Sequence, residues 1–307
     1  MPEWRSPFYA VEQLTDGVHA AIASPDGYAI CNCGIVDLDG ARLVFDASLT
    51  PDSARDLKSA SEKLLGRPPS LAALSHWHFD HSLGGQEFTG IPIWGTRRTR
   101  EILLESHDQL MAELTREQLE KDIRELERRR DAARSDEGRA DAELFLRINR
   151  GLLAAVGKLR LTPPDHTFET RLVLPGRRGA ELVSFGSGHT DADALLFLPQ
   201  EKILFTGDLA VIGLQPSMGS GNPDHWLVAL DEAARLAPER IVPGHGPVAK
   251  AEDLAETREY VSGILEAAES PTGAPLPRAL RRWEGTMSLE ENLQFARGWV
   301  ATHRPRK

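Results

Sequence analysis

Cysteine is scarce in this chain, since only Cys31 and Cys33 occur among 307 residues. Two thiols cannot build a disulfide framework, and a bridge between residues i and i+2 would be strained. In an extended strand this spacing places both side chains on the same side, so packing is their expected role. The scarcity excludes the small disulfide-stapled secreted proteins and favours an intracellular one.

Long apolar runs are lacking as well. No run of about twenty apolar residues occurs, and the opening MPEWRSPFYA holds no apolar stretch of signal-peptide length. We therefore expect a cytoplasmic protein with no membrane partner. The formal net charge of -10 is spread along the chain rather than gathered in blocks, which disfavours a nucleic-acid-binding surface.

What the chain does contain is a set of imidazoles and carboxylates in four short motifs: SHWHFDH, SGHT, TGD and PGHG. Seven of their side chains can bind a metal ion, namely His76, His78, Asp80, His81, His189, Asp208 and His245. Nitrogen and oxygen ligands without a thiolate suit zinc, and also manganese or iron. Zinc is the preferred assignment. A helical HExxH site is absent, which excludes the zincin proteases.

The spacing divides these ligands between two ions. In an extended or loosely turned segment His76 and His78 point to the same side and can reach one ion, while Trp77 points away into packing. His189 would complete the protein ligands of that first ion.

The neighbouring side chains Asp80 and His81 splay apart and can address a second ion, which His245 would complete. The two carboxylate oxygens of Asp208 can bridge both ions. The pattern therefore predicts a dinuclear metal centre.

Each ligand motif follows an apolar run that is typical of a buried strand. SLAALS leads into the first motif, AELVSFGSG into the second, KILFTGD into the third and RIVPG into the fourth. We therefore expect each ligand at the exit from a strand into a loop, where the active sites of α/β proteins gather. Glycines beside the ligands permit tight turns and close approach of the backbone.

In this order and at these separations the four motifs resemble those of the metallo-β-lactamase superfamily, from about Gly17 to about Val248. The resemblance implies an α/β fold, a four-layer αβ/βα sandwich with two metal ions in a cleft between the sheet edges. The family's ligand roles then fall on His76, His78 and His189 for one ion, on Asp80, His81 and His245 for the other, and on Asp208 as the bridge. This seven-ligand set is of the glyoxalase II type.

We expect residues 1–307 to form a single domain with two helical additions. A strongly charged helical insertion spans about residues 96–160, and helices extend the chain from about residue 251 to 307. The insertion contains many apolar residues, among them Leu103, Leu104, Met111, Leu114, Phe145, Leu146, Ile148, Leu152 and Leu153. Such a surface must pack on something, and either a lid over the cleft or a homodimer interface would account for it.

The expected activity is hydrolysis of an ester, lactone, thioester or amide of a small molecule. A hydroxide bound to the two ions would be the nucleophile, and Asp80 would act as a catalytic residue that orients it and carries a proton to the leaving group. Resistance-type β-lactamases generally lack an aspartate at the bridging position, so Asp208 disfavours that role. The alternatives are a persulfide dioxygenase-like oxidoreductase with a single iron, or a phosphodiesterase.

Overall fold

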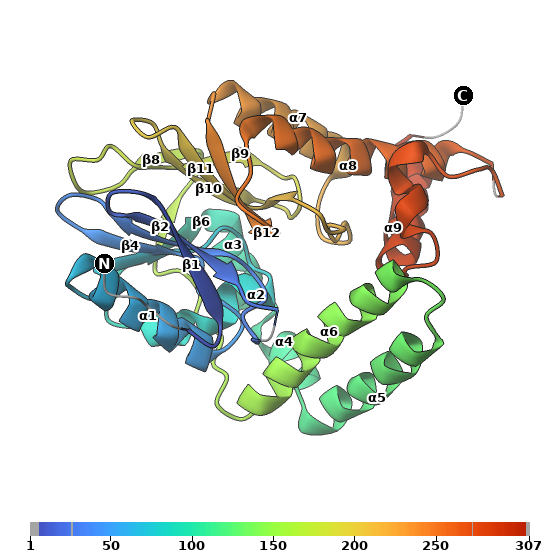
Figure 1. Cartoon of the computed structure of the whole chain (residues 1–307), viewed down its shortest axis with the longest axis horizontal. Helices are drawn as coiled ribbons and strands as arrows, with labels where there is room; N and C mark the ends of the chain where they lie inside the picture. Colours follow the sequence, from blue (N-terminus) through green and yellow to red (C-terminus); the bar gives the residue numbers. More distant parts are fainter. Residues whose placement is uncertain (1–5, 26, 272, 305–307) are drawn as a thin grey trace.

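Two β-sheets pack face to face, and helices cover the outer side of each (Figure 1). The computed structural model describes residues 6–25, 27–271 and 273–304. One sheet has seven strands in the order β1-β2-β3-β4-β5-β6-β7, and the other has five in the order β12-β11-β10-β9-β8. The predicted four-layer αβ/βα sandwich is confirmed.

The seven-stranded sheet changes from antiparallel to parallel pairing at β4. Its strands are β1 (Tyr9–Thr15), β2 (Val18–Ala23), β3 (Cys33–Asp37), β4 (Arg42–Phe45), β5 (Leu71–Ala73), β6 (Ile93–Thr96) and β7 (His166–Phe168). Strands β1 to β4 form an antiparallel meander, whereas β4, β5, β6 and β7 are parallel neighbours. Parallel neighbours need crossover connections, which places helices after β4 and β6.

Helix α1 (Pro51–Leu65) is the first crossover and covers the outer face of this sheet. The side chain of Thr50 accepts a hydrogen bond from the Ser53 amide, and Pro51 occupies the first turn, where its missing N–H costs nothing. The helix ends at Gly66, whose φ of 74° is the left-handed cap that glycine favours. Both ends of the helix are therefore set by local residues.

The five-stranded sheet carries the second half of the site. Its strands are β8 (Arg171–Val173), β9 (Glu181–Gly186), β10 (Asp193–Leu198), β11 (Ile203–Val211) and β12 (Arg240–His245). Strands β11 and β12 are parallel and are joined through helix α7 (Pro223–Arg235), which Asn222 caps. Helices α7 and α8 (Leu254–Glu269) lie over the outer face of this sheet (Figure 1).

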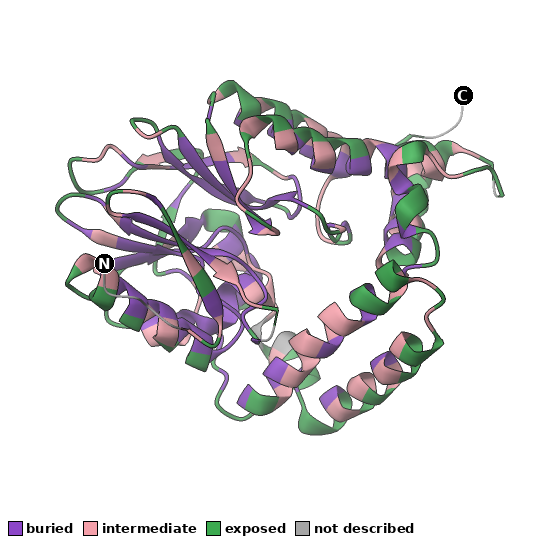
Figure 2. Cartoon of the chain, viewed as in Figure 1, coloured by how far each residue is buried: buried purple, intermediate pink, exposed green. Residues whose placement is uncertain are grey.

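The core between the sheets is apolar and fully buried. Phe45 of β4 meets Phe205 of β11 edge to face, with ring centroids 6.2 Å apart, a contact worth about 0.5–1.5 kcal/mol beyond burial alone. Close approach of the sheets needs a small residue here, because a Cβ on Gly34 would lie 3.0 Å from the Phe205 ring. Figure 2 shows the buried residues gathered along the facing strands. This close packing fixes how the two sheets lie against each other. The metal-binding motifs of both sheets meet at one edge of the sandwich.

Four helices occupy the charged stretch between β6 and β7. They are α3 (Arg97–Glu105), α4 (His107–Glu113), α5 (Arg116–Ala132) and α6 (Asp136–Ala155). Helices α5 and α6 form a hairpin beside the sandwich (Figure 1). Much of the apolar surface of the four helices packs within the chain, since Leu103, Leu114 and Leu152 are buried in the core of the seven-stranded sheet. Leu104, in contrast, is 54% exposed.

The C-terminal part adds α8 and α9 (Met287–His303). Helix α9 reaches α6, where the Asp141 carboxylate accepts hydrogen bonds from the amide and the hydroxyl of Ser288 at 3.1 and 2.5 Å. The insertion and the C-terminal extension are therefore joined to each other. None of the helices within the described ranges combines the length and the apolarity needed to cross a bilayer.

Candidate metal centre

The first ligand motif lies directly after a buried strand. Strand β5 ends at Ala73, the following residues carry His76 and His78, and the one-turn helix α2 (Phe79–Ser82) carries Asp80 and His81. The segment is therefore looped and then helical rather than extended throughout. Adjacent positions on a helix diverge by about 100°, which separates Asp80 from His81.

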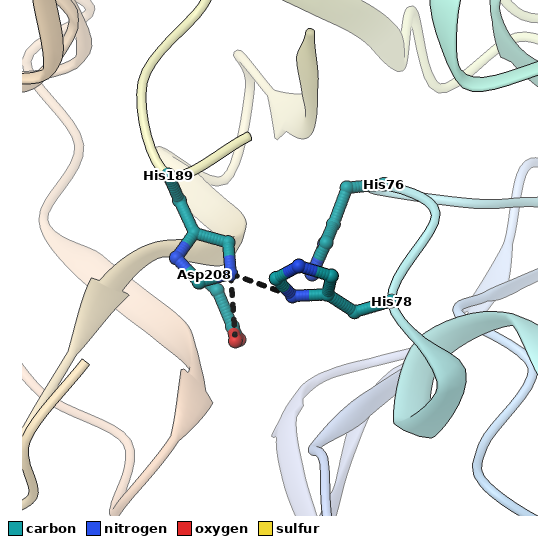
Figure 3. A group of neighbouring side chains, drawn as sticks. All are labelled: His76, His78, His189 and Asp208. Atoms are coloured by element: carbon teal, nitrogen blue, oxygen red, sulfur yellow. Dashed lines mark hydrogen bonds and ion pairs between the residues drawn. The ribbon is translucent and has the colours of Figure 1, made fainter. Parts of the chain in front are cut away.

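One cluster of potential ligands combines His76 and His78 with His189 and Asp208 (Figure 3). One ligand atom from each of the four lies within 4.8 Å of the others. His78 Nδ1 is 2.9 Å from His189 Nε2, and His189 Nε2 is 3.4 Å from Asp208 Oδ2. The structure brings together the three imidazoles that the sequence assigned to the first ion.

A second cluster contains Asp80, His81 and His245, again with ligand atoms within 4.8 Å of one another. His245 Nε2 lies 3.2 Å from Asp80 Oδ2, and His81 Nε2 lies 3.6 Å from the same oxygen. These are the residues that the sequence assigned to the second ion.

Asp208 lies between the two clusters. Its Oδ1 is 3.1 Å from His81 Nε2, while its Oδ2 is 3.2 Å from His245 Nε2 and also faces His189. The expectation that this ligand follows its strand is wrong, because β11 continues through Asp208 to Val211. Close approach of β12 requires glycine, since a Cβ on Gly244 would lie 1.9 Å from Asp208 Oδ1.

The donor atoms fit divalent cations. Among the described residues, His76 Nε2 is buried without a hydrogen-bond partner, and His81 Nε2 and Asp208 Oδ1 are buried with an ion-pair contact to each other but no hydrogen bond. Leaving such atoms unpaired costs about 1–3 kcal/mol each, whereas coordination of a cation would satisfy them. Imidazole nitrogens and carboxylate oxygens are ordinary ligands of divalent metals. The arrangement therefore implies divalent metal binding.

The imidazoles of the first cluster are held neutral. Burial, with the charge of His189 adding to it, lowers the pKa of His78 from 6.5 to about 3. Burial likewise lowers the pKa of His189 to about 4 and drives that of His76 well below its usual value. A neutral imidazole is the form that binds a metal ion.

The second cluster has the opposite electrostatics. Burial would lower the pKa of His245, but Asp208 and Asp80 outweigh it and raise the pKa to about 10. Burial opposes the same carboxylates at His81, whose pKa is also raised. Burial would raise the pKa of Asp80, yet His81 and His245 lower it to about 2. Without metal, these imidazoles carry protons and balance the carboxylates.

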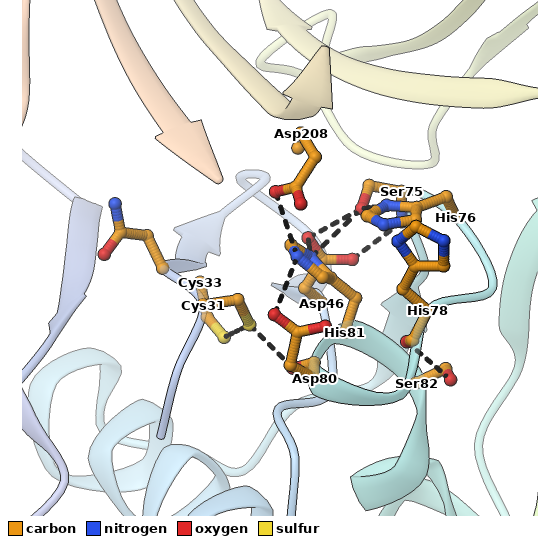
Figure 4. Close-up of polar contacts among 12 residues, drawn as sticks. Cys31, Cys33, Asp46, Ser75, His76, His78, Asp80, His81, Ser82 and Asp208 are labelled. Carbon is orange, nitrogen blue, oxygen red and sulfur yellow. Dashed lines mark hydrogen bonds and ion pairs between the residues drawn. The ribbon is translucent and has the colours of Figure 1, made fainter. Parts of the chain in front are cut away.

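Asp46 and Ser75 support the centre, and the sequence analysis did not identify them (Figure 4). Asp46 Oδ2 lies 2.8 Å from His81 Nδ1 and accepts a hydrogen bond from the Ser75 hydroxyl at 2.9 Å. That hydroxyl is also 2.9 Å from His76 Nδ1. The sequence feature that could have identified Asp46 is its position as an acidic residue directly after the apolar run RLVF.

Further contacts hold the remaining ligands. The hydroxyl of Ser220 lies 3.0 Å from His78 Nε2. Asp193 accepts hydrogen bonds from the backbone and the hydroxyl of Thr190, at 3.0 and 2.6 Å, and so braces the loop that carries His189. Burial raises the pKa of Asp193 to about 7 although these hydrogen bonds oppose the rise.

The two cysteines lie against this centre. Both are buried, their sulfurs are 3.7 Å apart, and they form no disulfide. Cys31 donates a hydrogen bond from Sγ to the backbone oxygen of Asp80 at 2.8 Å (Figure 4). The expected packing role is confirmed, with this added polar contact.

A cavity of about 170 Å³ opens above the two clusters. Ligand residues His78, Asp80, Asp208 and His245 line one side of it. The other sides are formed by α6, by the loop after β11 and by α9, through Leu144, Phe145, Ile148, Leu214, Gln215, Pro216, Ser217, Ser288, Glu291 and Asn292. The insertion and the C-terminal extension thus both form walls of the cleft over the centre.

Two facing sheets with a histidine- and aspartate-rich centre at their edge define a metal-binding αβ/βα sandwich protein. The sequence profile of the metallo-beta-lactamase superfamily matches residues 26–245. The chain belongs to this superfamily.

Individual relatives are distant. A type 2 metallo-beta-lactamase from Bacteroides fragilis is 28% identical over 118 residues, which cover 36% of this chain and 47% of that relative. The chain thus aligns with about half the length of that curated relative. Among solved structures, VMB-1 has a TM-score of 0.60 at 17% identity, covering 84% of this chain and 98% of its own. FIM-1 from Pseudomonas aeruginosa, in its mono-zinc form, has a TM-score of 0.57 at 18% identity, covering 83% of this chain and 95% of its own. These structural likenesses show a shared fold.

Proposed function

We propose that this protein is a hydrolase that uses two divalent metal ions, preferably zinc, to cleave an ester, lactone, thioester or amide of a small molecule. The position of Asp208 carries the proposal, because its carboxylate faces His189 of one cluster and both His81 and His245 of the other. When bound, such ions supply a water that is deprotonated near neutral pH and a Lewis acid for the substrate's carbonyl oxygen.

The protein's own groups have distinct tasks in this reaction. His76, His78 and His189 would hold one ion as neutral ligands, and His81 and His245 would hold the other after losing their protons. The histidines of the first cluster are thus ready to bind an ion, whereas those of the second must first lose a proton.

Asp80 would act on the attacking water. Its side chain is 18% exposed and lines the cleft, and its pKa of about 2 keeps it ionised at neutral pH. An ionised carboxylate accepts a hydrogen bond from the water and orients it. So low a pKa disfavours Asp80 as the group that protonates the leaving group.

Two alternatives differ in how they would use these residues. An oxidoreductase with one iron would leave Asp80, His81 and His245 without a ligand role, although their ligand atoms lie within 4.8 Å of one another. A phosphodiesterase would use the same centre on a phosphoryl group. The Bacteroides fragilis relative is named as a beta-lactamase, and a β-lactam is one cyclic amide within the proposed class. Cytoplasmic location and a homodimer through the insertion stay predictions.

A substrate panel tests the proposal. Zinc-loaded protein would be assayed on a para-nitrophenyl ester, a lactone, a thioester, a β-lactam and a phosphodiester, and iron-loaded protein on a persulfide with oxygen uptake recorded. We expect hydrolysis of a carboxylic derivative that chelator abolishes and zinc restores. His189→Ala should abolish it, while His303→Ala, which alters an exposed imidazole, should not. Hydrolysis that survives both chelation and His189→Ala, or persulfide-dependent oxygen uptake without any hydrolysis, would contradict the proposal.

A further inference from the structure

The two helices that wall the cleft differ in character. Helix α6 contributes Leu144, Phe145 and Ile148, which form an apolar wall. Helix α9 contributes the polar side chains of Ser288, Glu291 and Asn292. Because the scissile group must lie at the metal ligands, the rest of a bound substrate extends between these walls.

The charge on the walls has one sign. Among the described residues that line this cavity there is no lysine or arginine, and Glu291 is the ionisable residue that lies away from the metal ligands. The side-chain amide of Asn292 already has hydrogen-bond partners within the protein, because it donates to the Pro216 carbonyl at 2.8 Å and accepts from the Met218 amide at 3.0 Å. In the part of the chain that the structure describes, Glu291 is exposed and has no ion-pair partner.

Neighbouring charges do not cancel that of Glu291. Arg129 of α5 is the cation that acts on it, while Asp141 and Glu290 add negative charge nearby. The Arg129 guanidinium is itself paired with Glu125 at 3.3 Å and does not line the cleft. A substrate group that reaches α9 therefore meets an uncompensated carboxylate.

We propose that Glu291 makes the cleft select substrates whose acyl group is apolar and ends in a neutral or cationic group, and makes it reject those that end in an anion. The inference rests on the proposed hydrolase function and adds a specificity-determining residue to it. Like charges brought together at the rim of a cleft disfavour binding, and opposite charges favour it. The metal ligands would face the scissile group, whereas Glu291 lines the cleft on α9.

Three matched para-nitrophenyl esters test this selection with zinc-loaded protein: the hexanoate, the adipate monoester and the trimethylammonio-pentanoate. We expect kcat/KM for the anionic adipate to be about tenfold below that of the hexanoate. Glu291→Gln should bring the two within about twofold. Glu291→Lys should make the adipate the better substrate.

Glu290→Lys is the matched control. It makes the same charge change one position earlier on α9, at an exposed residue that does not line the cleft. It should leave the order of the three esters as in the unmodified protein. Equal kcat/KM for all three esters in the unmodified protein, or the same shift in Glu290→Lys as in Glu291→Lys, would overturn the inference.

A binding measurement separates failure of the inference from failure of the function. If none of the esters is hydrolysed, the hydrolase proposal fails, and calorimetric titration of zinc-loaded protein with para-nitroanilides of the same three acyl groups then decides the role of Glu291. Weaker binding of the anionic anilide that Glu291→Gln relieves would support selection. Equal dissociation constants, or no binding of any of the three, would overturn it.

Discussion

The carboxylate of Asp46 lies 2.8 Å from Nδ1 of His81, and both side chains are buried. This contact holds a proton on His81 Nδ1 and directs Nε2 towards the centre, where it faces Asp208 at 3.1 Å. Asp46 is itself held by the Ser75 amide, which donates to its other oxygen at 2.7 Å. Its backbone adopts a φ of 67°, which a non-glycine residue rarely does.

Replacing Asp46 should therefore weaken metal binding without removing a ligand. Asp46→Asn keeps the size of the side chain but loses the charge that stabilises and orients His81. We expect metal affinity to fall about 10- to 100-fold, measured by competition with a coloured chelator. Asp52→Asn, at an exposed position on α1, is the control and should leave affinity unchanged. Equal affinity of both variants would show that Asp46 does not position the ligand.

Gly244→Ala should disrupt the centre through a single methyl group. A Cβ at this position would lie 1.9 Å from Asp208 Oδ1 and 2.7 Å from the backbone of Gly207, so either the carboxylate or the strand must move. We expect loss of bound metal together with a lower Tm, measured by elemental analysis and calorimetry. Gly298→Ala on α9, where a Cβ would meet open space, should bind metal normally and melt no lower.

Filling the centre should release protons. The pKa of His245 is raised to about 10 and that of His81 is raised as well, so both imidazoles are protonated at neutral pH without metal. His78, with a pKa of about 3, and His189, with one of about 4, have no proton to lose. We expect these two imidazoles to release about two protons per chain on full loading with zinc, in addition to any proton lost by metal-bound water, counted by calorimetric titration in buffers of different ionisation enthalpy. Loading without proton release would contradict these charges.

The same shifts should shape the stability of the metal-free protein. The pKa of His245 in the folded protein, about 10, lies above its usual 6.5. Protonated His245 therefore stabilises the folded state fully below pH 6.5, and this stabilisation is lost as pH rises towards 10. The folded pKa of His78, about 3, lies below 6.5, so its contribution is lost as pH falls from 6.5 towards 3. We expect the Tm of chelated protein to fall on both sides of neutrality. A Tm that does not change from about pH 5 to about pH 9 would contradict this.

The sequence predicted the layers and the seven potential ligands because their signals are local. Apolar runs of strand length mark the sheets, and the ligands stand within short motifs beside those runs. Asp46 escaped prediction because its role appears only when β4 and β5, separated by α1 in the chain, pair side by side. The short edge strand β7 has too weak an apolar pattern to stand out.

The residues that line the cleft could not be predicted from the sequence for a similar reason. Periodicity indicated helices in the insertion and in the C-terminal part, but it does not state where a helix docks. The contact between Asp141 and Ser288 joins residues far apart in the chain, and the same helix brings Glu291 into the lining of the cleft. A surface glutamate on an amphipathic helix has no sequence feature that distinguishes it from its neighbour Glu290.

The metal content of Asp208→Ala tests the central claim most directly, because the Asp208 carboxylate faces ligands of both clusters. Chelated protein would be reloaded with zinc, freed of excess metal and measured by elemental analysis, with Asp52→Ala as the exposed control. We expect about two ions per chain in the unmodified protein and in the control, and reduced occupancy of both sites in Asp208→Ala. One tightly held ion in the unmodified protein, unchanged in Asp208→Ala, would contradict a bridged pair.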